Sequence, residues 1–163
     1  MIKQKGSTIM DNKKRIQELK RKNQITNVCK EWANFDVIIT MDDFLVVQDT
    51  LLLQDKILRK LDEMDNNKTS IIYQESENNM ISAFEKTLID YIKNNEKYVF
   101  FVKEVTKIGG LVLSGKTIIE KYQFIIRESE IYNKGCSIFF CSLNADQGVC
   151  LWKGEYDSRF YVW

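Results

Sequence analysis

Histidine and proline are both missing from this sequence of 163 residues. Without histidine there is no Ser-His-Asp or Cys-His catalytic arrangement, no histidine-ligated metal and no ordinary side chain that titrates near neutral pH. Without proline, where average usage of about 5% predicts roughly eight, there is no stiff linker and no proline-rich docking motif. Catalysis would have to use carboxylates, lysine, tyrosine, cysteine or a bound cofactor. The sequence therefore favours a protein without cofactor that is not an enzyme.

Long apolar runs are missing as well, since none approaches the roughly 18 residues of a membrane span. The charged first residues are not followed by the apolar region of a secretory signal. A hydrophobic content of 44% and a net charge of +1 are typical of a globular protein. We therefore expect a cytoplasmic protein without a membrane partner, with one domain from residue 11 to 163 after a disordered lead-in of residues 1–10. Composition leaves the oligomeric state open.

Short apolar segments fill the last third of the chain, from Tyr98 to Trp163. They are rich in β-branched and aromatic residues, and clusters of glycine, asparagine and aspartate separate them, as in an antiparallel meander. The predicted strands are 99–102, 111–113, 124–126, 138–140, 149–152 and 160–163.

Helical periodicity dominates the sequence before residue 95. The predicted helices are 11–34, a segment capped by Asp49 or Thr50 that runs to Met64, and 77–94 capped by Ser76. A hairpin is predicted between Phe35 and Gln48, and a short strand at 69–73. Together these elements predict an α+β fold, in which about three helices from the N-terminal half pack on a mostly antiparallel sheet of about five to seven strands.

Residues 110–117 match the pattern G-x-x-x-x-G-K-[ST]. In these eight positions the chain resembles phosphate-loop NTPases, and the resemblance implies a nucleotide site made of Gly110, Gly115, Lys116 and Thr117. The bulky Leu-Val-Leu interior favours a different interpretation, in which a strand at 111–113 lies between two turns. Too few residues follow for the parallel strands of a nucleotide-binding core. Pairing of 111–113 in a sheet would exclude the nucleotide site.

Six cations gather in the first predicted helix, namely Lys13, Lys14, Arg15, Lys20, Arg21 and Lys22. They form either a patch that contacts phosphates, as in a protein associated with nucleic acid, or a solvated helix face. No aromatic residue is interleaved with the cations, which favours the solvated face.

The four cysteines, Cys29, Cys136, Cys141 and Cys150, form no C-x-x-C motif. The odd spacing of Cys136 and Cys141 places them on opposite faces of a regular strand. Reduced core thiols are expected, and no metal site is predicted.

Aromatic and charged residues concentrate at the end of the chain. On a final strand, Phe160 and Val162 share one face while Tyr161 and Trp163 share the other. Either a helix covers the second face or it is an exposed patch for a partner. The candidate partner-binding residues are Trp152, Tyr156, Asp157, Arg159, Tyr161 and Trp163.

Three functions from different classes remain. The leading hypothesis is a small cytosolic protein-binding module that acts by occlusion, such as an inhibitor or a toxin-neutralising immunity protein, whose partner is another protein. The alternatives are a nucleotide-binding protein that uses residues 110–117 and a nucleic-acid-associated protein that uses the basic helix.

Overall fold

The computed structural model describes residues 4–73, 77–128, 137–153 and 158–163. The chain divides into two compact units, residues 1–42 and 43–163. The first unit consists mainly of helix α1 (Gln4–Ala33), which begins inside the segment predicted as a lead-in. Residues 1–3 of that segment and the predicted cap Ser76 lie outside the described residues.

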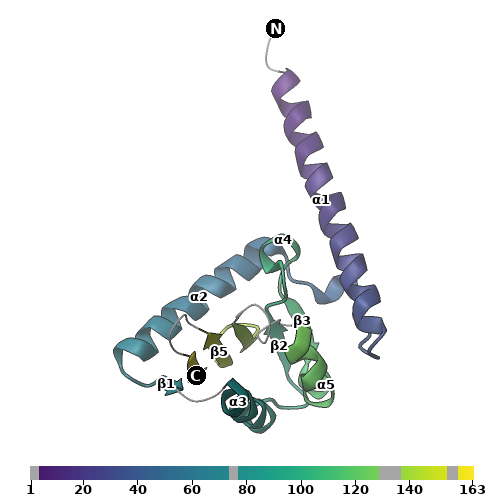
Figure 1. Cartoon of the computed structure of the whole chain (residues 1–163). Coiled ribbons are helices and arrows are strands. Elements are labelled where there is room, and N and C mark those ends of the chain that lie inside the picture. The colour runs from purple at the N-terminus through teal and green to yellow at the C-terminus, as the bar shows by residue number, and fades with distance from the viewer. Residues whose placement is uncertain (1–3, 74–76, 129–136, 154–157) are drawn as a thin grey trace. The chain divides into compact units, whose positions relative to one another are not determined.

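An antiparallel sheet forms the centre of the second unit (Figure 1). Its six strands follow the order β1-β6-β5-β4-β2-β3, and every pairing is antiparallel. The last three strands form the predicted C-terminal meander, so the α+β fold with an antiparallel sheet of five to seven strands is confirmed. The strands are β1 (Ile71–Tyr73), β2 (Lys97–Phe100), β3 (Leu111–Ser114), β4 (Ile138–Ser142), β5 (Gly148–Lys153) and β6 (Ser158–Val162).

Helices cover both faces of this sheet, with α2 on one face and α3 and α5 on the other (Figure 1). Helix α4 is a single turn beside α2, and a short 3-10 helix precedes α2. The bounds are η1 (Met41–Asp43), α2 (Val47–Asn66), α3 (Glu77–Tyr91), α4 (Val105–Ile108) and α5 (Gly115–Glu128).

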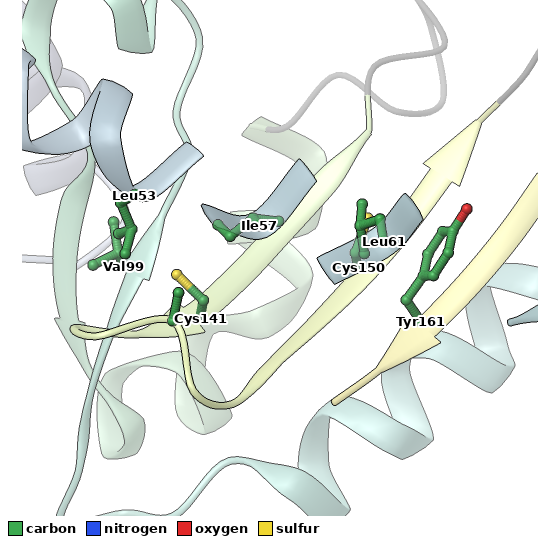
Figure 2. Close-up of a cluster of buried hydrophobic side chains, with 8 residues drawn as sticks. Leu53, Ile57, Leu61, Val99, Cys141, Cys150 and Tyr161 are labelled. Atoms are coloured by element: carbon green, nitrogen blue, oxygen red, sulfur yellow. The ribbon is translucent and has the colours of Figure 1, made fainter. Parts of the chain in front are cut away.

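Helix α2 packs on the sheet through one apolar stripe. Leu53, Ile57 and Leu61 recur every four residues, so they lie on one side of the helix. All three are buried, and Figure 2 shows them above side chains from four strands of the sheet. Full burial of each such side chain contributes about 1.5–3 kcal/mol to folding. The strand residues beneath the stripe are Val99, Cys141, Cys150 and Tyr161.

Aromatic rings dominate the opposite face of the sheet. Phe84 of α3 meets Phe160 of β6 edge to face, with ring centroids 5.7 Å apart. Phe100 and Phe140 stack at 5.0 Å on neighbouring strands. Helix α5 adds Ile118, which is fully buried. Both faces of the sheet are therefore core.

Two predicted strand regions are wrong. Residues 124–126 belong to α5, which is kinked at Lys121, and Ile125 and Ile126 after the kink are buried, as Ile118 before it is. In the predicted hairpin, Phe44 forms an isolated bridge with Leu111. Helix α2 then begins at Val47, where the second strand of that hairpin was predicted.

Thr50 joins the start of α2 to the turn before β3. Its side chain is fully buried, where the hydroxyl donates to the carbonyl of Val46 at 3.0 Å and accepts from the amide of Gly110 at 2.9 Å. Gly109 beside it has a φ of +96°, and a Cβ there would overlap the carbonyl oxygen of Leu45. Thr50, predicted as a helix cap, instead holds two elements in close backbone contact.

Asp65 holds the other end of α2 to β6. Its carboxylate accepts hydrogen bonds from Arg159 at 2.7 Å, Tyr161 at 3.1 Å and Ser70 at 2.7 Å. Desolvation raises the pKa of Asp65, but the hydrogen bonds from Ser70 and Tyr161 and the charge of Arg159 outweigh it, so the pKa lies below its ordinary value. The ionised form of Asp65 is therefore the one that the fold stabilises.

Replacing Gly109 with alanine should destabilise the protein strongly. The new Cβ meets the backbone of Leu45, and the positive φ is unfavourable for alanine. We expect the free energy of unfolding to fall by about 2 kcal/mol or more in a urea titration. Thr106→Ala, at an exposed position of α4, is the control and should stay within about 0.5 kcal/mol of wild type. A Gly109→Ala variant as stable as this control would contradict the close approach.

The Asp65 network should make stability depend on pH. Because the folded pKa is lowered, its contribution is present above the unfolded value of about 3.9 and is lost as pH falls through the folded pKa. Asp65→Asn should lower the free energy of unfolding by about 1–2 kcal/mol at pH 7, and the difference from wild type should shrink on acidification below about pH 4. Asp62→Asn, at an exposed position of α2, is the matched control. Equal stability of the two variants at pH 7 would refute the network's role.

Candidate functional site

A groove of about 280 Å³ opens beside α2 on the sheet face that α2 covers. Its lining comes from α2, from the chain that follows β2, and from the start of β4. The apolar part of this lining consists of Ile57, Leu58, Phe101, Val102, Val105 and Phe139.

An aromatic row runs along the groove and beyond it. The amide of Phe101 donates to the carbonyl of Phe139 at 3.4 Å, which continues the β2–β4 ladder and sets the two rings side by side at 5.8 Å. Trp152 on β5 meets Phe139 edge to face at 6.1 Å. The two phenylalanines are partly buried, whereas Trp152 is 37% exposed. The row therefore offers an accessible apolar surface made of large, rigid rings.

Polar groups surround the apolar floor of the groove. Gln54 lies on α2, Ser137 precedes β4, and Lys103 and Glu104 lie in the turn before α4. Glu104 has a left-handed backbone with a φ of 60°, and its carboxylate pairs with Lys107 at 2.9 Å. A left-handed conformation is uncommon for a residue other than glycine, and here it turns the chain sharply at the groove. An apolar floor within a polar rim suits the burial of an apolar side chain from a partner.

The final strand does not present the predicted exposed aromatic pair. Tyr161 is 3% exposed beneath α2, and Phe160 is 4% exposed on the opposite face. Trp163 is partly buried, and its indole donates to the carbonyl of Ala145 at 3.0 Å. Helices thus cover both faces of β6, which is the alternative that the sequence left open.

The other predicted partner-binding residues differ in accessibility. Arg159 is partly buried and its guanidinium is bound to Asp65. Tyr156 and Asp157 lie outside the described residues. Of the described candidates, Trp152 has the exposed aromatic ring, and the structure brings it next to Phe139 and Phe101, which the sequence did not single out.

The phosphate-loop pattern of residues 110–117 is a strand followed directly by a helix. Leu111–Ser114 form β3 and pair residue by residue with β2, and α5 begins at Gly115. The amides of the would-be loop already have acceptors: Gly115 donates to Glu96 at 2.8 Å and Lys116 to Asn94 at 3.2 Å. A phosphate loop must point such amides at the anion, so this segment does not form one.

Packing explains the glycines of this pattern. A Cβ at Gly110 would press against Val99, and one at Gly115 would overlap the carbonyl oxygen of Lys93. Thr117 donates its amide to the hydroxyl of Ser114 at 3.1 Å, so the two residues cap the start of α5. The pattern therefore arises from a close strand-to-helix connection.

The six cations predicted to form a basic helix face all lie on α1. Residues 12–20 and Lys22 are exposed, whereas Arg21 is partly buried. The structure thus displays these cations on a helix, as both interpretations of the sequence require.

Two of the cysteines lie deep in the core. Cys141 and Cys150 are free, fully buried thiols beneath α2. Burial raises the pKa of Cys141 to about 12 and raises that of Cys150 well above its ordinary value, so both thiols stay protonated near neutral pH. Cys29 forms no disulfide and is partly buried, and Cys136 lies outside the described residues. Within the described part of the chain no group of three acidic, cysteine or histidine side chains is placed to hold a metal ion.

Local patterns gave no sign of the groove. Phe101 and Phe139 belong to apolar runs in which every residue has strand character, so the sequence does not show which ring is left partly uncovered. The alternation of each strand predicts that Phe139 shares a face with Cys141. Where α2 leaves that face open depends on the path of the helix, which only the structure provides.

Comparison with known proteins places the chain in one family. Among the described residues no helix has the length and hydrophobicity needed to cross a membrane. No curated protein and no solved structure matches the chain. A family model described as YxiF protein matches residues 28–163, which include every residue of the groove and all six strands. Because this match covers more than half of the sequence, the chain belongs to the YxiF family.

Proposed function

We propose that the protein is a small cytoplasmic protein-binding module that acts by occlusion, as an inhibitor or a toxin-neutralising immunity protein does. The observation that carries this proposal is the groove beside α2, together with its aromatic row of Phe101, Phe139 and Trp152. Large aromatic residues at the centre of an interface often supply most of the binding free energy.

The size of the groove supports a protein partner over a small-molecule substrate. Its volume of about 280 Å³ is at the lower limit of the range of about 300–1,000 Å³ that is typical of small-molecule sites. A single leucine or phenylalanine side chain from a partner would suit it better. The exposed ring of Trp152 would then contact the partner's surface beside that inserted side chain.

The chemistry of the groove also supports binding over catalysis. Its floor is apolar, and its charged rim residues, Lys103 and Glu104, are exposed. General acid–base or nucleophilic catalysis needs a positioned group whose pKa is tuned to the reaction, usually by burial. The whole sequence contains no histidine to fill that role. A surface that covers a partner's active site needs a complementary shape and apolar area. This groove is concave and its floor is apolar.

Affinity capture with groove variants tests the proposal. The tagged protein is used to capture partners from a lysate of its own source cell, and bound proteins, nucleotides and nucleic acids are identified together. We expect one stoichiometric protein with an affinity better than about micromolar. Leu58→Glu places a charge in the apolar lining and Trp152→Ala removes the exposed ring, so each should weaken binding by at least about tenfold.

Two control variants make this test specific to the groove. Leu143→Glu changes an equally apolar, 53% exposed residue at the opposite end of the β4–β5 hairpin and should bind as wild type does. Lys116→Ala removes the lysine of the phosphate-loop pattern and should also leave binding unchanged. Thermal melting checks that each variant is folded. The proposal is wrong if no host protein binds, or if both groove variants bind as tightly as Leu143→Glu. Captured nucleotide that disappears with Lys116→Ala would support the nucleotide alternative instead.

A further inference from the structure

Helix α1 carries an exposed apolar ridge between two rows of cations. Ile16 and Leu19 are 52% and 53% exposed, and a spacing of three residues places them on the same side of the helix. Residues seven apart lie two turns along the helix at nearly the same angle. By this geometry, Lys13 and Lys20 form a row on one side of the ridge, and Arg15 and Lys22 form a row on the other.

The spacing of these residues is that of a coiled-coil seam. If Ile16 occupies position a of a heptad, Leu19 occupies position d, and the four cations occupy the flanking e and g positions. Ile9 and Asn23 stand at the neighbouring a positions in the sequence, and Asn12 and Thr26 stand at the neighbouring d positions. The exposed apolar ridge is therefore one heptad long and is followed by polar residues.

The charges of the two flanking rows favour an acidic partner for this ridge. In a pair of two α1 helices, whether parallel or antiparallel, the flanking rows of one copy would face the flanking rows of the other. These rows contain only lysine and arginine, so self-pairing is opposed. A helix with apolar a and d residues and with glutamate or aspartate at e and g would match both the ridge and its charges.

We propose that α1 docks an acidic amphipathic helix of another protein along the ridge formed by Ile16 and Leu19. This docking surface and the groove are made of different residues, which belong to different units of the chain. Nucleic acid would use the same cations, but phosphate contacts give no role to two exposed aliphatic side chains. A long helix exposed over residues 12–20 also gains stability from a partner, because isolated helices are marginal in water.

Binding of a designed acidic peptide to the full chain tests this proposal. The probe is a fluorescent peptide of roughly four heptads with leucine at a and d and glutamate at e and g. A scrambled peptide of the same composition is the control probe. We expect micromolar binding of the heptad peptide by fluorescence anisotropy, at least about tenfold weaker binding of the scrambled one, and weakening as salt rises.

Variants of α1 separate a helix partner from the alternatives. Ile16→Ser combined with Leu19→Ser keeps every charge and should weaken peptide binding at least about tenfold. Lys14→Ser, on the opposite side of the helix, is the matched control and should have little effect. Thermal melting and circular dichroism confirm that the variants fold.

Four results would overturn the proposal. The first is failure of the heptad peptide to bind, and the second is equal binding by the double serine variant, which would mean attraction by charge alone. The third is binding of a DNA duplex that is tighter than peptide binding and unaffected by the double serine change, which would identify a nucleic-acid surface. Concentration-dependent dimers that the double serine variant abolishes would likewise replace the acidic partner with a second copy of the chain.

Discussion

The packing of one helix on one face of a six-stranded sheet determines most of this structure. Helix α2 crosses the strands and is about 10 Å wide with its side chains, whereas strands of five or six residues, such as β4 and β5, are about 17–20 Å long. The stripe of Leu53, Ile57 and Leu61 therefore cannot cover the face alone. Toward one end of the strands Trp163 fills the space beside Gly148, where even a methyl group would overlap its ring. Toward the other end the surface that remains is the groove.

Close packing around β3 accounts for the sequence pattern that most resembles a functional motif. Gly109 must lack a side chain because the backbone of Leu45, just before α2, lies against it, and Gly110 because Val99 of β2 does. Thr50 of α2 can then bond the amide of Gly110. Because β3 turns directly into α5, Gly115 must lack a side chain too. Close backbone approach and phosphate binding both need glycine, so a short glycine pattern cannot distinguish them. The hydrogen bonds of the backbone amides do distinguish the two cases. Here the amides of Gly115 and Lys116 donate to backbone carbonyls of the protein itself.

Elements with strong local patterns could be predicted from the sequence, and elements that depend on a distant partner could not. The apolar stripes of α2 and α3 and the strands of the C-terminal meander lie where periodicity and turn residues placed them. The segment 124–126 has strand composition, yet it belongs to α5, where Ile125 and Ile126 are buried, and tertiary packing overrides the local preference. In the predicted hairpin, Val37 and Ile39 are buried and Ile38 is 79% exposed, so the alternation was real. No local signal showed that the chain at Val47 would start a helix instead of a pairing strand.

The accessibility of the predicted partner-binding residues could be read from the sequence only in part. Alternation along β6 correctly separated Phe160 from Tyr161, but it says nothing about which face a helix covers, and both are covered. The exposed aromatic ring is instead that of Trp152 on the neighbouring strand β5, at a position that α2 does not cover. The groove lies wholly within the residues that match the YxiF family, whereas the cationic ridge of α1 precedes residue 28, where the match begins.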